Sequence, residues 1–128
     1  MSHTLLIIED NLQNSYMMRF LLEKHGFEVR TAENGPDGIR SAVEYRPDAI
    51  LLDIQLPGMD GYAVAGRLKA DQLTNCIPII AVTSYAMAGD REKILSAGAT
   101  GYIEKPINPE TFVNEIRQYL SWDCKEEE

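Results

Sequence analysis

The most informative absence in this sequence is that of a long apolar run. No stretch approaches the roughly 18 consecutive apolar residues that a membrane-spanning helix requires, and the N-terminus carries no signal peptide. We therefore expect a cytoplasmic protein that does not associate with membranes. Cysteine is also scarce: Cys76 and Cys124 match no metal or redox spacing. A disulfide between them is an open alternative, but reduced thiols are the expectation for a cytoplasmic chain.

Positive charge is in short supply as well. The chain has 12 Lys and Arg against 20 Asp and Glu, so its formal net charge is -8 at pH 7. A protein that binds nucleic acid needs a basic face toward the phosphate backbone, and this balance argues against such a partner. The two histidines, His3 and His25, share no obvious constellation with a second metal ligand, and we interpret both as solvated side chains.

What the sequence does contain is an alternation of short apolar runs with segments of helical periodicity. The runs are Leu5–Ile8, Phe27–Thr31, Ala49–Leu52, Ile79–Val82 and Gly101–Ile103. Five strands that alternate with five helices predict an α/β fold, in which helices cover both faces of a parallel sheet. The run "FEVRT" alternates apolar with charged residues, which places it at an edge of that sheet.

The punctuation between the runs agrees with this interpretation. Gly26 ends the first helix, Asn34 opens the second, and Asn108 followed by Pro109 predicts the start of the last helix. At 128 residues the chain is long enough for one domain with a sizeable core. We expect this domain to span residues 1–122, and we expect the acidic residues 123–128 to be a disordered tail.

Polar residues follow four of the apolar runs. Glu9 and Asp10 come after the first, Asp53 after the third, Thr83 after the fourth and Lys105 near the end of the fifth. Ligands of an open α/β sheet bind beyond the carboxyl ends of its strands, so these side chains should converge there. A buried run gains nothing by ending on a carboxylate unless the charge is neutralised or used, which points to a role for Asp53 in chemistry.

Such a cluster has a specific chemical logic. Three neighbouring carboxylates repel one another, and Mg²⁺ takes oxygen ligands while keeping several waters, so it suits a site with two or three acids. An ammonium and a hydroxyl opposite the metal would neutralise charge on a phosphoryl group, with one carboxylate placed as the nucleophile. The residues therefore indicate a site that holds a phosphoryl group.

Four motifs carry a resemblance to a known family. "IIEDN", "LLDIQLPGMDG", "IIAVTS" and "YIEKPI" occur in the order and spacing of the CheY-like receiver domains of two-component response regulators, over essentially the whole chain. "EDNLQN" and "AVTSYAMAGD" most resemble the DivK-type single-domain regulators and the receivers of hybrid kinases. The resemblance implies a flavodoxin-like (βα)5 fold with strand order 2-1-3-4-5.

The resemblance also implies a role for each residue of the cluster. Asp53 would accept a phosphoryl group from a histidine kinase or a histidine phosphotransfer protein. Asp10, Asp53 and the backbone carbonyl of Gln55 would bind Mg²⁺, and Glu9 would act on the metal through water. The chain would assist its own phosphorylation and also its own dephosphorylation, which would be slow. It would have no separate substrate to turn over.

The same resemblance predicts how the signal leaves the site. Thr83 and Lys105 would contact the phosphoryl oxygens, and the bond between Lys105 and Pro106 would be cis. Tyr102 occupies the position of the rotating switch aromatic of the family. Signalling would then proceed through altered contacts with an unidentified downstream protein, and we expect the chain to be a monomer or a weak dimer.

Two functions from other classes compete with this one. A magnesium phosphohydrolase of the haloacid-dehalogenase kind also uses a nucleophilic Asp, but it needs a second acid at the position of Gln55, and this chain lacks a cap domain. A protein-binding module with an inert site is disfavoured because no pocket residue is missing. Individually, Thr83 could cap the following helix, Lys105 could be a surface lysine and Tyr102 a half-buried edge residue.

Overall fold

The computed structural model describes residues 3–56, 58–84 and 88–120, and these residues form five strands alternating with five helices. The strands are β1 (Thr4–Ile8), β2 (Glu28–Ala32), β3 (Ala49–Asp53), β4 (Ile79–Thr83) and β5 (Gly101–Glu104). The helices are α1 (Leu12–Lys24), α2 (Gly35–Tyr45), α3 (Gly61–Ala70), α4 (Ala88–Ser96) and α5 (Phe112–Leu120). Among the described residues, no helix is long and apolar enough to cross a membrane.

All strand pairs are parallel, and the order in the sheet is β2-β1-β3-β4-β5. The α/β class and this strand order confirm the prediction. The chain reverses its direction of travel across the sheet after β2, so that β1 and β3 lie side by side at the centre. β2 is an edge strand and exposes Glu28, Arg30 and Thr31, as its alternating sequence predicted.

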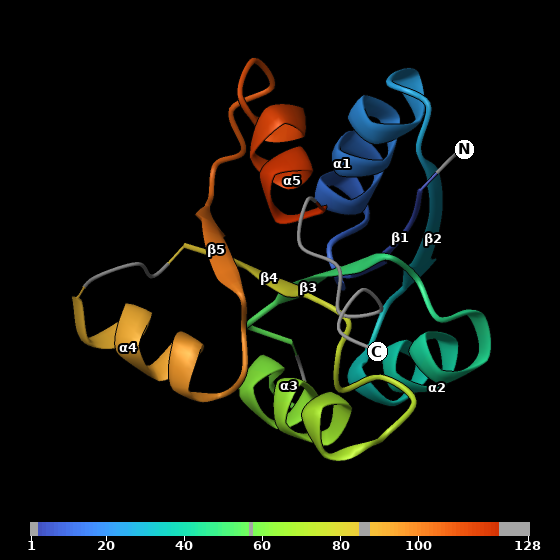
Figure 1. The fold of residues 1–128 in the computed structure, drawn as a ribbon. Coiled ribbons are helices and arrows are strands. Elements are labelled where there is room, and N and C mark those ends of the chain that lie inside the picture. Colours follow the sequence, from blue (N-terminus) through green and yellow to red (C-terminus); the bar gives the residue numbers. More distant parts are fainter. Residues whose placement is uncertain (1–2, 57, 85–87, 121–128) are drawn as a thin grey trace.

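The helices form a layer on each face of the sheet. Figure 1 shows α1 and α5 over one face and α2, α3 and α4 over the other. Successive residues of a strand point to opposite faces, and β1 supplies both layers in this way. Its Leu5 and Ile7 join the core beneath α1 and α5, whereas Leu6 and Ile8 join the core beneath α2 and α3.

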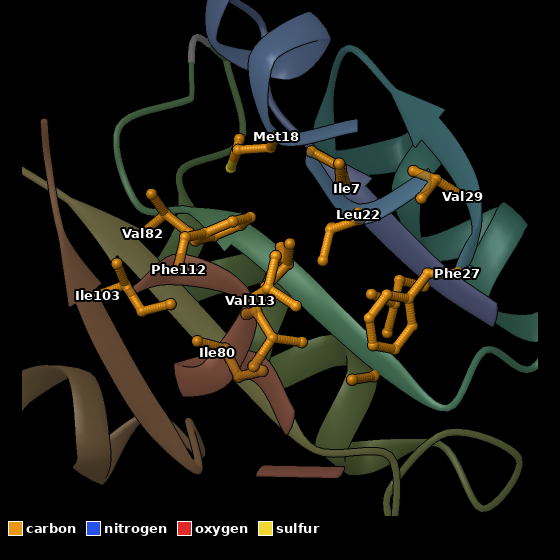
Figure 2. Close-up of a cluster of buried hydrophobic side chains, with 14 of the residues drawn as sticks. Ile7, Met18, Leu22, Phe27, Val29, Ile80, Val82, Ile103, Phe112 and Val113 are labelled. Carbon is orange, nitrogen blue, oxygen red and sulfur yellow. The ribbon is translucent and has the colours of Figure 1, made fainter. Parts of the chain in front are cut away.

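The core beneath α1 and α5 is the larger of the two. Phe112 is the largest fully buried side chain of the described chain, and it lies among apolar residues from both helices and all five strands. Figure 2 shows how these side chains interlock, with ten of them labelled: Ile7, Met18, Leu22, Phe27, Val29, Ile80, Val82, Ile103, Phe112 and Val113. Burial of this apolar surface is the main force that holds the two helices on the sheet.

Side-chain caps fix where the helices start. The side chains of Asn11, Asn34 and Asp60 each accept a hydrogen bond from a backbone amide in the first turn of α1, α2 and α3. The assigned start of α5 at Phe112 lies later than predicted, because residues 109–111 form a turn. Asn108 still makes the contacts of a cap: its side chain accepts from the Glu110 amide at 3.0 Å, and its carbonyl accepts from the Phe112 amide at 2.9 Å.

The strands extend slightly further than the apolar runs predicted. Asp53, Thr83 and Glu104 are the last residues of β3, β4 and β5, so the polar groups belong to the strand ends themselves. Cys76, between α3 and β4, is disulfide-bonded, so the expectation of a reduced thiol is wrong for this residue. Cys124 and the predicted tail, residues 123–128, lie outside the described residues.

Candidate functional site

The carboxyl ends of β1 and β3 bring three acidic side chains together. Oxygen atoms from Glu9, Asp10 and Asp53 all lie within 4.8 Å of one another. Glu9 and Asp53 are buried, at 1% and 3% exposure, and Asp10 is exposed. The parallel pairing of neighbouring strands β1 and β3 places these residues at the same edge of the sheet, as the sequence predicted.

Lys105 reaches into this acidic group from the segment after β5. Its Nζ lies 3.0 Å from Glu9 Oε1 and 3.5 Å from Asp53 Oδ2. The backbone amide of Lys105 donates to the Thr83 carbonyl at 2.8 Å, and the Lys105–Pro106 peptide bond is cis, as the resemblance implied. Lys105 was expected near Asp53 because both follow apolar runs at the same edge of the sheet, but no pattern in the sequence predicted the shorter contact with Glu9.

Backbone amides hold two of the carboxylates in place. The amide of Asn11 donates to Glu9 Oε2 at 3.2 Å, and the amide of Gln55 donates to Asp53 Oδ1 at 2.9 Å. The first contact gives Asn11 a double task, since its own side chain caps α1. Sequence reasoning assigned neither task to Asn11. An Asn directly before a helical segment is the signal that could have indicated the cap.

The electrostatics of Glu9 are those of a carboxylate that lacks solvent. The pKa of Glu9 is raised from its ordinary 4.5 to about 7: burial raises it most, the neighbouring Asp53 raises it too, and Lys105 partly offsets both effects. Glu9 Oε1 is buried, and the Lys105 ammonium lies 3.0 Å from it. A buried carboxylate with two further acids and one ammonium beside it carries excess negative charge, which fits a site that takes a cation or its bound water.

The loop that follows Asp53 is packed tightly against the end of β3. Gly61, the first residue of α3, donates its amide to the Ile54 carbonyl at 3.0 Å. A Cβ atom at Gly61 would lie only 2.4 Å from the Ile54 Cα and 2.7 Å from the Asp53 carbonyl oxygen. Only glycine allows α3 to begin this close to the strand that carries Asp53, so the backbone around the acid is firmly placed.

Thr83 and Tyr102 lie on the two strands beyond Asp53. Thr83 is fully buried at the end of β4, and the residue before it, Val82, pairs with Asp53 across the sheet. Tyr102 on β5 pairs with Ala81, and its half-buried ring lies at the edge of a small apolar cluster under α4. Thr83 therefore lies at the edge of the sheet where Asp53 lies, and Tyr102 lies within the neighbouring strand β5.

Comparison with known proteins decides the family to which this fold and site belong. Residues 5–117 match the response regulator receiver domain. The chain belongs to this family. The matched region includes the acidic group, the hydroxyl at the end of β4 and the lysine after β5.

Individual receiver domains and regulators are similar over nearly their full lengths. The polar-differentiation response regulator DivK of Brucella anthropi is 43% identical over 120 residues, which cover 94% of this chain and 98% of that protein. A putative response regulator from Chloroflexus aurantiacus superposes with a TM-score of 0.90 at 32% identity, covering 95% of this chain and all of the other. The receiver domain of a Pseudomonas aeruginosa sensor histidine kinase, crystallised with magnesium coordinated in its active-site cleft, gives 0.87 at 33% identity, with 95% and 100% covered.

These likenesses establish the function at the level of the family. The chain is a DivK-like receiver domain of two-component signalling, and it works as a phosphorylation-based switch. The predicted family, fold and function are confirmed.

Proposed function

We propose that Asp53 is the residue that receives the phosphoryl group. The observation that carries this proposal is the position of its carboxylate, which is buried at the end of a central strand and faces the Lys105 ammonium. An Asp53 oxygen would form the new bond to phosphorus while the bond from phosphorus to the donor atom breaks. The Gln55 amide, which donates to Asp53 Oδ1, orients the carboxylate for this reaction.

Glu9, Asp10 and Asp53 are the side chains that we propose for a Mg²⁺ site, with the Gln55 carbonyl as a further ligand. The spacing of their oxygens and the buried Glu9 Oε1 support this donor set. When bound, the metal supplies positive charge to the phosphoryl oxygens. Glu9 would act through water rather than directly, because its carboxylate is already held by the Asn11 amide and the Lys105 ammonium.

Lys105 and Thr83 are the residues that we propose to sense the phosphoryl group. The phosphoryl group would add negative charge next to the Lys105 ammonium, which would leave its contact with Glu9 and pair with a phosphoryl oxygen. The Thr83 hydroxyl, at the end of the next strand, would donate to a second oxygen. These contacts would form only when Asp53 is phosphorylated, so the positions of the two side chains would depend on phosphorylation.

The chain's own chemistry would be limited to gaining and slowly losing this group. A hydrolase that used Asp53 as its nucleophile would need an acid two residues later, and Gln55 stands there instead. We therefore propose a phosphoacceptor without a separate substrate. The extent of the domain over residues 1–122, the monomeric or weakly dimeric state and the cytoplasmic location stay predictions.

The donor that we propose is a histidine kinase or a histidine phosphotransfer protein, and α1 offers it a surface. Leu12, Tyr16 and Phe20 recur every fourth residue, are 66%, 70% and 53% exposed, and make one apolar stripe along the helix. The rings of Tyr16 and Phe20 stack at 6.3 Å between centroids. The stripe starts beside the acidic group, because α1 follows Glu9 and Asp10 directly, so a protein resting on it would reach Asp53.

The test is labelling by a small acyl phosphate. Incubation with acetyl phosphate and Mg²⁺ should add one phosphoryl group to the intact protein, detected by mass spectrometry. The group should be absent in Asp53→Asn and when the metal is chelated with EDTA. Asp60→Asn is the matched control, because it makes the same chemical change at a helix cap that Asn also fills well. Full labelling of Asp53→Asn would rule out the proposed acceptor.

A further inference from the structure

The helix α4 is attached to the sheet less firmly than its neighbours. Between residues 89 and 96 a single side chain, Ile94, is buried. It enters a small apolar cluster with Ile54 and Ala81, and Tyr62 and Tyr102 pack at the edges of that cluster. The helices α1 and α5, by contrast, each bury several side chains in the large core. The position of α4 therefore depends strongly on whatever contacts flank Ile94.

Two tyrosine rings from neighbouring elements provide these flanking contacts. The Lys93 ammonium lies over the ring of Tyr62 in α3, 4.5 Å from its centroid. The Arg91 guanidinium lies 5.3 Å from the centroid of Tyr102 in β5, and it is 3.9 Å from the Glu104 carboxylate. A cation over an aromatic face is attracted by the ring, so α4 is held from the α3 side and from the β5 side.

The Lys93–Tyr62 contact and the Arg91–Tyr102 contact are connected to Asp53 through different parts of the chain. Tyr62 directly follows Gly61, whose backbone is hydrogen-bonded to Ile54 and packed against the Asp53 carbonyl. The backbone of Tyr62 is therefore positioned by the end of β3, through a connection that does not pass through Thr83. Burial raises the pKa of the Tyr62 phenol, and the nearby carboxylates of Asp90 and Asp60 raise it further. These carboxylates also add negative potential to the place that the Lys93 ammonium occupies.

We propose that Tyr62 and Lys93 form a latch that holds α4 in its unphosphorylated position and couples it to the end of β3. The proposal rests on the proposed function only for its link to signalling; the latch itself is a property of the unmodified protein. An exposed cation–π contact is worth about 0.5–1 kcal/mol, which corresponds to a 2- to 5-fold change in the population of a displaced α4. The latch therefore sets how readily the switch changes state.

Hydrogen exchange of the unphosphorylated protein, in EDTA, tests the latch directly. Amides of α4 should exchange about 2- to 5-fold faster in Tyr62→Leu and in Lys93→Gln than in the original chain, because the displaced state is more populated. Tyr62→Phe keeps the ring and Lys93→Arg keeps the cation, so both should retain the original rates. Amides of α5 serve as the internal reference and should not change in any variant.

Any of three results would overturn the latch. One is an unchanged rate across α4 in both Tyr62→Leu and Lys93→Gln. Another is an equal acceleration in α4 and α5, which would show general destabilisation instead of release of one helix. A Tyr62→Phe variant that behaved like Tyr62→Leu would also contradict it, because the hydroxyl and not the ring face would then be responsible.

A beryllofluoride titration with Mg²⁺ links the latch to the switch. The amide NMR signals of α4 should reach half of their change at about 2- to 5-fold lower beryllofluoride concentration in Tyr62→Leu than in the original protein. An unchanged midpoint would show that the latch plays no part in switching. If beryllofluoride left the original protein itself unchanged, the proposed role of Asp53 would fail, while the exchange experiment would still decide on the latch.

Discussion

The ammonium of Lys105 lies closer to Glu9 than to Asp53, at 3.0 Å from Glu9 Oε1 against 3.5 Å from Asp53 Oδ2. In the unphosphorylated protein the lysine therefore compensates two buried carboxylates at once. In the resting state, the repulsion between these two carboxylates is therefore offset by one cation.

Lys105→Gln should lower the free energy of unfolding in EDTA by about 1–3 kcal/mol, because the buried Glu9 and Asp53 lose their cation. Saturating Mg²⁺ should recover much of the loss, since binding to the folded state supplies positive charge to the same carboxylates. Thermal or urea unfolding with and without the metal measures both effects. Lys24→Gln, at an exposed position of α1, is the control and should change little. Equal stability of Lys105→Gln and the original chain in EDTA would contradict the compensation.

Glu9 should make the metal-free protein less stable as pH rises. Its pKa is about 7 in the folded protein and 4.5 as its ordinary value, so the folded state holds the proton more tightly than the unfolded state. The resulting stabilisation is fully present below pH 4.5 and is lost as pH rises through 7. Glu9→Gln cannot ionise, so in EDTA its stability relative to the original chain should increase between pH 5 and pH 8. Parallel stability curves over that range would show that Glu9 does not titrate there.

Much of this site could be predicted because its signals are local. The apolar runs marked the strands, and a polar residue at the end of each of four runs marked the edge where ligands bind. The pairing of Lys105 with Glu9 could not be read in the same way, because it depends on how two side chains from distant elements share a small space. The start of α5 was misplaced for a local reason, since Asn108 can support either a helix or the turn that precedes one.

The attachment of α4 was equally hidden in the sequence. The sequence around Tyr62 or Lys93 does not distinguish a latch from two surface residues. Their contact joins α3 to α4, and the strand β4 lies between these helices in the sequence. The weak apolar face of α4, with Ile94 as the one buried side chain between residues 89 and 96, becomes meaningful only when the neighbouring rings are placed.

The exposed stripe on α1 should matter for a protein donor and not for a small one. Tyr16→Ser and Phe20→Ser remove apolar contact area at positions that are largely exposed, so the fold should tolerate them. Phosphotransfer from a purified histidine kinase or phosphotransfer protein that labels the original chain should slow by about tenfold or more. Labelling by acetyl phosphate should stay unchanged. Leu73→Ser, which alters an exposed leucine after α3, is the matched control. Equal slowing with acetyl phosphate would place the defect in the site.

Thr83→Ala should separate the two routes by which Asp53 can influence α4. A phosphoryl group or beryllofluoride on Asp53 adds acceptor oxygens, and we expect the Thr83 hydroxyl to move toward them and leave space for the Tyr102 ring. In the original protein, amide NMR signals should therefore change across residues 88–98, 101–103 and 109–120. In Thr83→Ala the changes in β5 and α5 should be lost, because the space behind β4 no longer depends on Asp53.

The changes around Tyr62 should persist in Thr83→Ala, because the backbone of Tyr62 is positioned through Gly61 and Ile54. Tyr62→Leu should give the complementary result, with β5 still responding and the displaced position of α4 about 2- to 5-fold more populated before beryllofluoride is added. Beryllofluoride must first be shown to bind each variant, by the response of the Gln55 amide that donates to Asp53. If β5 and α5 responded fully in Thr83→Ala, this hydroxyl would not be the relay, and the signal would reach them through Lys105, whose amide is bonded to the end of β4.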